Sequence, residues 1–474
     1  MTNKDQLLYE TVAKEIESQI QLGALRVGEK IASVREQSKL FNVSINTVLQ
    51  AYVLLESRGV IESRPQSGFY VSKIVTTEEV RPESDVQTRP APILIPDLVS
   101  DLFEAAANDK YVLLGAACLS PELHPNEAIA RITRSILRTH SDVNARYEFT
   151  PGHLPLRQQI AKRLLRTGHK VSAAEVTITN GALDSLHLAL RAILKPGETI
   201  LIESPNYFGI LQSIASLGYK VIEVPANART GVDPDDVKKI LSRYKIGAAI
   251  LMPNFNNPLG SVIPDANKRE LVKIFSKFGV PVIEDDIYGD LAFSGVRPKL
   301  LRAFDEEGIV ISCSSFSKTI SPGSRTGWAL PGKFEKEFRR LQLSSTVGAN
   351  RLQQYVIAEF MATGAFERYL RKIRPVLQEQ LHRVSQSVLK HFPEETRFTQ
   401  PQGGFMLWLE LPKKFDSLEL YKAAAAKKIS IAPGVIFSAN GNYRNYLRLN
   451  CGRLWRPEID AAIKTLGTLA KQQL

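Results

Sequence analysis

One stretch of the chain combines a lysine, an arginine and several small hydroxyl residues: Ser314-Ser-Phe-Ser-Lys-Thr-Ile-Ser-Pro-Gly-Ser-Arg-Thr-Gly327. It follows the apolar run Ile309-Val-Ile311, which predicts a buried parallel strand. Lys318 therefore lies just after a strand, and Arg325 follows it with a glycine on each side. Short motifs often match by accident, so a surface lysine and a capping serine explain the stretch as well when it is considered alone.

Apolar runs of the same kind alternate with helical patterns through most of the remaining chain. This alternation predicts an α/β fold around a mostly parallel sheet. In such folds the functional residues lie at the carboxyl ends of the strands. The predicted strands are residues 176–178, 199–202, 220–224, 248–252, 281–283 and 309–311.

A glycine opens the helix that is predicted after the first of these strands. Gly181, Ala182 and Leu183 would present backbone N–H groups at the helix N-terminus. Such a terminus carries partial positive charge and is a natural seat for a phosphate group. An ordinary turn from strand to helix would show the same pattern, so this feature needs support from the other strand ends.

Motifs at successive strand ends support one another because they occur in a consistent chain order. Asn257-Pro-Leu-Gly260 follows one strand, Glu284-Asp-Asp-Ile-Tyr288 follows the next, and the Lys318 stretch follows the last. Together they resemble the cofactor site of fold-type I pyridoxal phosphate (PLP) enzymes, the aminotransferase family. The resemblance implies that Lys318 forms a Schiff base with the cofactor aldehyde. Ser315, Ser317 and Arg325 would hold the phosphate, where a guanidinium can donate two parallel hydrogen bonds.

The resemblance also assigns the residues around the cofactor ring. Asp285 would pair with the pyridine nitrogen and keep it protonated, so that the ring accepts electrons. Its neighbour Asp286 would point elsewhere. Tyr207 would stack on the ring, and Asn257 and Tyr288 would face its O3′ oxygen. For the tyrosines, an ordinary position in the core remains the alternative.

Three further segments resemble parts of the same family. Tyr147, in residues 147–157, matches a tyrosine that crosses to the phosphate of the partner subunit, which implies a homodimer with shared sites. Arg448 matches the arginine that binds a substrate α-carboxylate, which is a bidentate task. The smaller C-terminal α+β subdomain of the family, about residues 350–474 here, is indicated by residues 401–408, 432–434 and 446–450.

The first 75 residues follow a different pattern, which predicts a small and mostly helical domain. The first helix has an apolar face formed by every fourth residue: Leu8, Val12, Ile16 and Ile20. Ser33 and Ser44 are N-cap residues for two more helices, the second of which ends at Gly59. Two short strands follow, at residues 60–61 and 69–71. The order helix, helix, turn, helix and hairpin is typical of a winged helix-turn-helix.

This segment resembles the GntR family of DNA-binding domains over its whole length. The matching motifs are residues 28–36, 43–48, 55–59 and 67–68. In that family the third helix enters the major groove, and the wing reaches the DNA backbone or minor groove. The resemblance implies DNA contacts from Ser33, Arg35, Ser44, Asn46, Thr47 and Gly68.

Two departures from the GntR pattern leave the target sequence open. Ile45 stands where an arginine is common, and Ala32 stands where a proline is common. General charge adds little, because the chain has a net charge of +12 but residues 1–75 hold nine Lys or Arg and eight Asp or Glu. The motif therefore carries the prediction of DNA binding. Capping or solvation remains the alternative for each single residue.

Composition places a linker between the two regions, in residues 73–98. This segment contains four prolines and little periodicity. Its apolar residues Ile93, Leu94 and Ile95 would allow it to lie along the large domain. The prediction is a DNA-binding domain in residues 1–72, a linker in 73–98 and an aminotransferase-like domain in 99–474.

Composition also indicates a cytoplasmic protein that contacts no membrane. No run of about 18 apolar residues is present, so no transmembrane helix is expected. The first residues lack the layout of a signal peptide. Cys118, Cys313 and Cys451 are far apart and show no metal-ligand spacing. We therefore expect no metal site and interpret the cysteines as core residues.

A GntR-type winged helix joined to an aminotransferase-like domain resembles the MocR subfamily of bacterial transcription regulators. The resemblance implies a PLP-binding regulator that binds an operator in double-stranded DNA and responds to an amino acid or amine. An active aminotransferase with an accessory DNA-binding domain is the alternative, since every residue for transamination is present. A third interpretation is a DNA-binding protein whose large domain only dimerises.

Overall fold

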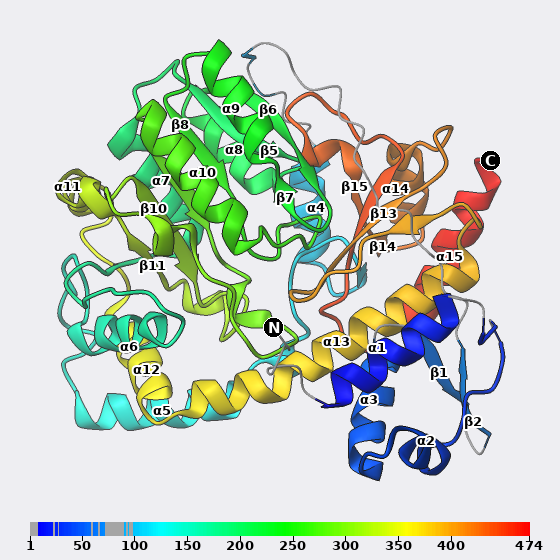
Figure 1. Cartoon of the computed structure of the whole chain (residues 1–474). Coiled ribbons are helices and arrows are strands. Elements are labelled where there is room, and N and C mark those ends of the chain that lie inside the picture. Colours follow the sequence, from blue (N-terminus) through cyan, green and yellow to red (C-terminus); the bar gives the residue numbers. More distant parts are fainter. Residues whose placement is uncertain are drawn as a thin grey trace. The chain divides into compact units, whose positions relative to one another are not determined.

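The computed structural model describes residues 8–21, 24–26, 28–57, 60–64, 67–71, 90–91, 93 and 98–474. The chain divides into two units, residues 1–78 with 382–390 and residues 79–381 with 391–474 (Figure 1). Most of the predicted linker lies outside the described residues, so the domain limits stay predictions.

Within its described residues, the N-terminal unit contains three helices and a hairpin. The helices are α1 (Leu8–Gln21), α2 (Val34–Phe41) and α3 (Ile45–Ser57), and β1 (Ile61–Arg64) pairs in antiparallel fashion with β2 (Gly68–Val71). Apolar residues at helical spacing on α1 and α3 form its core: Val12, Ile16, Val48, Tyr52 and Leu55. The predicted winged helix-turn-helix is confirmed.

Capping residues explain where α2 and α3 begin. The Ser33 hydroxyl accepts a hydrogen bond from the Glu36 backbone N–H at 3.3 Å, and the Glu36 carboxylate accepts one from the Ser33 N–H at 2.8 Å. This reciprocal pair satisfies two N–H groups that the helix itself leaves free. In the same way, the Ser44 hydroxyl accepts from the Thr47 N–H at 3.1 Å.

Eight strands form the central sheet of the large unit, in the order β4-β11-β10-β9-β8-β5-β6-β7 (Figure 1). The six strands that were predicted run parallel, whereas β11 and β7 run antiparallel to their neighbours. The strands are β4 (Thr177–Thr179), β5 (Thr199–Ser204), β6 (Lys220–Asn227), β7 (Gly231–Val232), β8 (Ala248–Leu251), β9 (Val282–Asp285), β10 (Val310–Ser315) and β11 (Gly327–Leu330).

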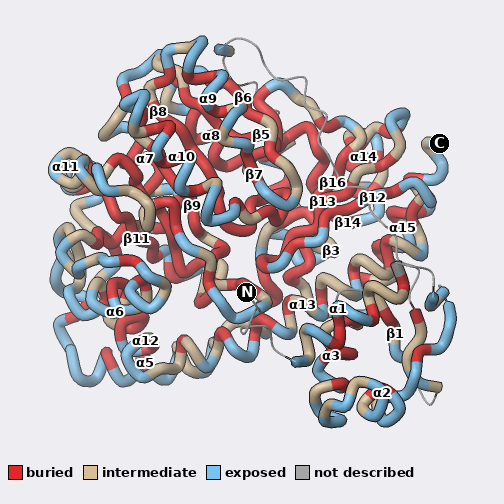
Figure 2. Tube along the Cα trace, in the orientation of Figure 1, coloured by how far each residue is buried: buried red, intermediate tan, exposed pale blue. Residues whose placement is uncertain are grey.

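Helices cover both faces of this sheet, so its strands are apolar on both sides. Along β5, Ile200 and Ile202 belong to one core cluster, which includes residues of α6, α7 and α12, whereas Leu201 belongs to a second cluster with residues of α9 and α10. Figure 2 shows these strands as mostly buried. The helices of this part are α5 (Asn126–Thr139), α6 (Leu154–Leu165), α7 (Ala182–Ile193), α8 (Phe208–Ser216), α9 (Pro234–Arg243), α10 (Asp265–Phe278), α11 (Glu335–Ser345) and α12 (Arg351–Ala362).

A smaller antiparallel sheet, in the order β12-β13-β16-β15, forms the C-terminal α+β subdomain. Two short segments, β14 and β3 (Val112–Leu113), pair in parallel, so residues that follow α4 (Leu98–Ala106) join this subdomain. Its other elements are α13 (Ala365–His391), β12 (Arg397–Phe398), β13 (Met406–Glu410), α14 (Ser417–Ala426), β14 (Ile429–Ser430), β15 (Ala432–Pro433), β16 (Tyr446–Asn450) and α15 (Pro457–Gln472).

The described part of the predicted linker lies along the large unit. Ala91 exchanges two backbone hydrogen bonds with Val221 of β6, at 3.2 and 3.0 Å. Ile93 packs against the core. The expected contact is therefore confirmed for these residues, whereas Leu94 and Ile95 lie outside the described residues.

Candidate cofactor site and DNA-binding face

The carboxyl ends of β9 and β10 bring two predicted site residues together. Asp285 ends β9 and lies opposite Cys313 of β10, and Lys318 follows the end of β10. Lys318 is half-buried, and its Nζ donates a hydrogen bond to the Ala117 carbonyl oxygen at 2.6 Å. Parallel strands therefore place an amine and a carboxylate at one edge of the sheet, as the strand-end rule predicts.

The surroundings of Lys318 lower the pKa of its amine. Burial lowers the pKa of the Lys318 amine, and the positive charges of Arg448 and Arg325 lower that pKa further, against the opposing effect of Asp285. A neutral amine is the nucleophilic form. The site can therefore present Lys318 for covalent attachment to a carbonyl compound.

Asp285 is a buried carboxyl group with one unused oxygen. Its Oδ1 has no hydrogen-bond partner within the part of the chain that the structure describes. Burial, followed by the negative charge of Asp286, raises the pKa of Asp285 to about 7. An unpartnered oxygen of this kind is costly, and it is suited to a cationic N–H donor from a ligand.

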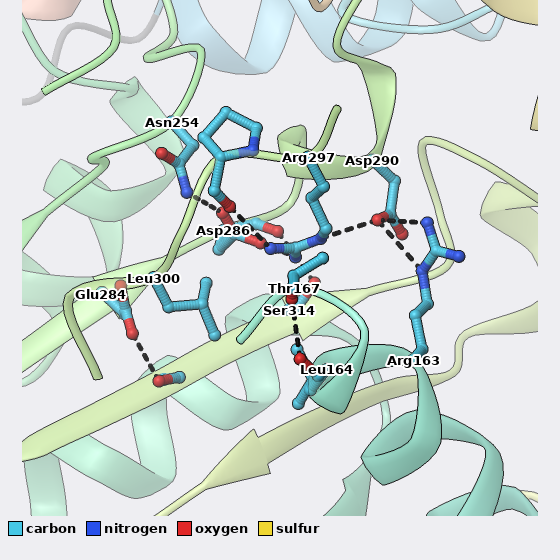
Figure 3. A network of polar contacts seen from close by, with 12 residues as sticks. Arg163, Leu164, Thr167, Asn254, Glu284, Asp286, Asp290, Arg297, Leu300 and Ser314 are labelled. Carbon is cyan, nitrogen blue, oxygen red and sulfur yellow. Dashed lines mark hydrogen bonds and ion pairs between the residues drawn. The ribbon is translucent and has the colours of Figure 1, made fainter. Parts of the chain in front are cut away.

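The next residue, Asp286, points into a separate polar network (Figure 3). It forms an ion pair with Arg297 and accepts a hydrogen bond from Asn254 Nδ2 at 2.6 Å. Arg297 Nε and Arg163 Nη2 both contact Asp290 Oδ1, at 2.7 and 2.8 Å. Burial would raise the pKa of Asp290, but the charges of Arg163 and Arg297 hold it well below its usual range. The prediction that Asp286 faces away from the cofactor site agrees with these contacts.

The predicted phosphate-binding residues gather at the N-terminus of α7. Gly181 is its N-cap, with φ +108°, and a Cβ atom there would lie 2.7 Å from a guanidinium nitrogen of Arg325. Arg325 donates to the Asn180 carbonyl at 3.0 Å and to the Ser317 hydroxyl at 3.5 Å. The Ser315 hydroxyl accepts from the Ser317 N–H at 3.2 Å. Ala182 and Leu183 open α7, where the first N–H groups lack partners inside the helix.

Two tyrosines and an asparagine follow other strand ends of the sheet. Tyr207 is the N-cap of α8 and is half-buried, and burial raises its pKa to about 12. Tyr288 is buried, with its ring 5.5 Å from that of Phe405, and burial raises its pKa far above the usual value. Both hydroxyls therefore stay protonated. Asn257 is buried, and its Oδ1 accepts a hydrogen bond from Arg448 Nη1 at 3.0 Å.

Arg448 of β16 is fully buried and has no carboxylate partner among the described residues. Its second terminal nitrogen donates to the Gly115 carbonyl, and its Nε has no partner. Burial lowers the pKa of Arg448, although it remains far above neutrality. A buried charge without a counter-ion is unfavourable, so this arginine suits the carboxylate of a small ligand.

Five of the six candidate DNA-contacting residues are exposed, and Thr47 is half-buried. Arg35 and Asn46 are exposed, on α2 and in the first turn of α3. Ser33, Ser44 and Thr47 take part in the capping contacts of α2 and α3. These three residues therefore have a capping role, and that role does not exclude a DNA contact. Gly68 is exposed, with φ +105°, and is the first residue of β2.

Two family models match the chain. One, described as "Aminotransferase class I and II", matches residues 119–466, and the other, "Bacterial regulatory proteins, gntR family", matches residues 8–71. The Escherichia coli proteins named uncharacterized HTH-type transcriptional regulators YjiR and YdcR are 35% and 34% identical, over 97% and 98% of this chain and 98% and 99% of their own lengths. The chain belongs to the MocR-type transcription regulators. The N-terminal unit of this MocR-type protein is thus a DNA-binding domain.

Solved structures and enzymes are similar to the large unit. The 2-aminoadipate transaminase of Thermus thermophilus is 33% identical over 74% of this chain and 88% of its own. LysN, the α-aminoadipate aminotransferase of the same species, was solved with N-(5′-phosphopyridoxyl)-L-leucine. It is 30% identical, with a TM-score of 0.72 over 79% of this chain and 94% of its own. Pyridoxal phosphate is the cofactor of this MocR-type protein.

The residues present fit this cofactor. The unused Asp285 oxygen matches a protonated ring nitrogen, and the N-terminus of α7 at Gly181, with the Arg325 guanidinium close against it, matches a phosphate group. Bound PLP supplies an aldehyde that accepts amines and a ring that accepts electrons. The protein would supply the Lys318 amine, the Asp285 carboxylate that would keep the ring nitrogen protonated, and hydroxyl donors from Tyr207 and Tyr288.

Tyr147 stands apart from the other candidate residues. It is 74% exposed, and its ring lies 5.8 Å from that of Phe149. Contacts within one chain therefore do not bring it to the site. Its role across a dimer stays a prediction.

Sequence reasoning missed the backbone groups that hold Lys318 and Arg448. Their partners are the carbonyl oxygens of Ala117 and Gly115, which follow β3. Backbone carbonyls occur in every residue and leave no mark in a sequence, so no motif could reveal this pairing.

Two absences and one correction complete the site. Among the described residues, no three or more His, Cys, Asp or Glu side chains gather as metal ligands, and no helix is long and apolar enough to cross a bilayer. Cys313 and Cys451 are buried as expected. The expectation is wrong for Cys118, which is exposed because the loop after β3 leaves its side chain at the surface.

Proposed function

We propose that this MocR-type regulator binds an amino acid or amine at the Lys318 site, and that this event changes how its N-terminal domain binds operator DNA. The observation that carries the proposal is Arg448. A fully buried guanidinium without a carboxylate partner, near a reactive amine, suits a ligand that has both an amino group and a carboxylate.

Each residue of the proposed site has a separate task. Lys318 holds the cofactor covalently, Asp285 contacts the ring nitrogen, and Arg448 binds the ligand carboxylate. Tyr207, Asn257 and Tyr288 contact the ring and its oxygen. The phosphate is held by Gly181, Ala182, Leu183, Ser315, Ser317 and Arg325.

Sensing requires more than binding. The ligand must have different affinities for two arrangements of the DNA-binding domains, because only that difference in free energy can shift the equilibrium between them. The proline-rich residues 73–98 are the proposed joint for such a change, and residues 1–72 and 99–474 are the proposed domain limits. An operator-binding role places the protein in the cytoplasm.

A homodimer is also part of the proposal. Tyr147 and its exposed neighbour Phe149 form an aromatic pair at the surface, which suits contact with a second copy of the chain. Tyr147 would reach the cofactor phosphate of the partner subunit. Sedimentation analysis should give the mass of a dimer, and Tyr147→Phe should release PLP more readily. A monomer that retains PLP as tightly as a dimer contradicts this arrangement.

The central experiment follows cofactor absorbance and DNA binding together. PLP-loaded protein is titrated with a panel of amino acids, matched amines and matched carboxylic acids, and DNA affinity is measured on an operator selected from random sequences. An amino acid that changes both signals is expected.

Variants of Arg448 test the carboxylate in that ligand. Arg448→Met should weaken the response to the amino acid by about 10- to 100-fold, because a charge-assisted hydrogen-bonded pair is lost. The response to the matched amine should remain. Arg243→Met, an exposed arginine of α9, is the control. Equal weakening for amino acid and amine contradicts the role of Arg448.

Catalytic transamination is the second candidate function. The neutral-leaning Lys318 amine and the unpartnered Asp285 oxygen are the groups that such chemistry needs, and a relative 33% identical over 74% of this chain is named a transaminase. Many turnovers with an amino acid and a keto acid, at ordinary enzyme rates, would favour this function. Single-turnover behaviour that still alters DNA affinity favours the regulator.

A further inference from the structure

A surface pocket of about 240 Å³ lies in the large unit, and none of its lining residues belongs to the proposed cofactor site. Three segments form it: residues around β3, the short helix η1 (Pro121–Leu123) with its N-cap Ser120, and the loop from β16 into α15. A volume of this size suits a ligand as small as an amino acid, because drug-sized ligands occupy larger clefts.

Charges of both signs line the pocket. Arg456 Nη2 is already paired with Glu122 Oε1 at 2.6 Å. Arg453 is half-buried and makes no hydrogen bond or ion pair with any residue that the structure describes. Asp109, at the other segment, likewise has no ion pair within the described chain. The pocket therefore offers one cationic group, Arg453, whose charge also lowers the pKa of Glu122, and one exposed anionic group, Asp109, and neither forms an ion pair with a described residue.

The position of Arg453 favours a carboxylate. Helix α15 begins at Pro457, and residues of its first turn, Glu458 and Ile459, line the pocket. The N-terminus of a helix of this length carries partial positive charge, which adds to the charge of the guanidinium and offsets part of the negative charge of Glu458 in the same turn. A carboxylate can accept two parallel hydrogen bonds from such an arginine.

Apolar side chains complete the lining. Val112 and Leu113 of β3 and Leu454 are partly buried, and Ile459 is buried. They provide a surface against which an aliphatic group loses contact with water. A ligand that uses every part of the pocket therefore has a carboxylate, an ammonium group and an aliphatic side chain.

We propose that this pocket binds a free α-amino acid with an aliphatic side chain, without covalent chemistry. Arg453 and the N-terminus of α15 hold the carboxylate, Asp109 holds the ammonium group, and the residues of β3 contact the side chain. A simple carboxylic acid would leave Asp109 without a partner, and a simple amine would leave Arg453 without one. A zwitterion satisfies both.

The segment that follows β3 connects the pocket to the proposed cofactor site. The Ser120 hydroxyl, in the pocket, accepts from the Leu454 N–H at 2.9 Å. Two residues earlier, the Cys118 carbonyl accepts from Asn450 Nδ2 at 2.8 Å, and the adjacent Ala117 carbonyl accepts from Lys318 Nζ. An amino acid in the pocket thus contacts the segment that positions Lys318. The effect of the bound amino acid on Lys318 rests on the proposed function, whereas the binding of the amino acid to the pocket does not.

Equilibrium dialysis with radiolabelled L-leucine tests the proposal. PLP-loaded protein is first treated with borohydride, which makes the link to Lys318 permanent and prevents exchange with leucine there. Saturable leucine binding is expected. Arg453→Met should weaken it at least about tenfold, since a charge-assisted contact is lost, and Arg243→Met should not change it. Retained cofactor absorbance shows that each variant is folded.

Competing ligands and a second variant sharpen the result. 4-Methylpentanoate lacks the amine and 3-methylbutylamine lacks the carboxylate, so each should compete at least about tenfold less well than leucine. Arg448→Met should leave the binding intact. Absence of saturable binding, or binding that depends on Arg448 and not on Arg453, overturns the proposal.

The outcome is separable from that of the proposed function. If the protein takes up no PLP, borohydride produces no permanent adduct and the proposed function fails. Leucine binding that depends on Arg453 can still be measured on the cofactor-free protein. It would then support the pocket alone.

Discussion

Two neighbouring carboxylates at the end of β9 have opposite surroundings. Asp285 keeps one buried oxygen without a partner, whereas Asp286 is enclosed by Arg297 and Asn254. The same contrast separates two buried arginines: Arg297 contacts two carboxylates, and Arg448 contacts none among the described residues. Asp286 and Arg297 have their polar partners within the protein. Asp285 and Arg448 keep polar atoms without a partner, and a ligand can contact these atoms.

This difference shows which buried polar groups are candidates for ligand binding. An unsatisfied buried group costs free energy, so the rest of the fold must compensate for it. A satisfied network holds the chain in place and offers a ligand nothing to bind. The paired network beside β9 thus supports the strand end, and the unpaired groups Asp285 and Arg448 are candidates for contact with a ligand.

The largest expected effect is on the unpaired side. Lys318→Ala should abolish the visible absorbance of the cofactor and its trapping by borohydride, because Lys318 is the amine that we propose forms the covalent link. DNA binding by the N-terminal unit should persist, which shows that the variant is folded. Colour that remains in the variant, with trapping at another lysine, contradicts the assignment.

The ion-pair network around Arg297 is tested by the free energy of unfolding. Arg297→Met leaves Asp286 and Asp290 without their shared cation, and breaking a buried pair costs about 3–5 kcal/mol. Urea unfolding of the cofactor-free protein should report this loss, with Arg243→Met as the control for an exposed arginine. A change below about 1 kcal/mol would show that the network contributes little.

The pH dependence of stability tests the buried carboxyl group of Asp285. The pKa of Asp285 is raised from 3.8 to about 7. The folded protein therefore keeps a proton that the unfolded chain loses, and stability falls as pH rises through this range. Asp285→Asn removes that loss. In the cofactor-free protein, the free energy of unfolding of Asp285→Asn relative to the parent should increase up to about pH 7, by at most about 4 kcal/mol.

PLP should reverse the effect of that substitution. An asparagine cannot keep the ring nitrogen protonated, so Asp285→Asn should retain less cofactor than the parent protein. Unfolding curves at several pH values, with and without PLP, measure both outcomes. A variant with the stability profile and the cofactor retention of the parent would remove Asp285 from the site.

The smallest effect is expected on the exposed DNA-binding face, where binding groups carry no cost of burial. Asn46→Ala should weaken operator binding by about 1–3 kcal/mol, the range for a good side-chain contact to a base. Arg35→Ala should also weaken it and lower its salt dependence if it contacts phosphate. Fluorescence anisotropy measures both, with cofactor absorbance as the control. Unchanged affinity in both variants would show that the recognition helix is misassigned.

The sequence by itself determined which residues belong to the candidate cofactor site. Lys318, Asp285 and Asn257 follow predicted strands, and parallel strands carry their carboxyl ends to one edge of a sheet. The N-cap residues Ser33 and Ser44 could also be predicted from the sequence, because capping depends on residues that are near in the chain.

Only the tertiary structure decided what those residues contact. The carbonyls of Gly115 and Ala117 meet Arg448 and Lys318 across more than 200 residues of chain. The network around Arg297 and the pocket beside Arg453 also join distant segments. Such contacts arise from the packing of layers, and a local pattern contains no information on which distant carbonyl or carboxylate will fill the remaining space. The antiparallel strands β7 and β11 were not predicted for the same reason. Their positions depend on the neighbouring strands: β7 lies at one edge of the sheet, and β11 lies between β4 and β10.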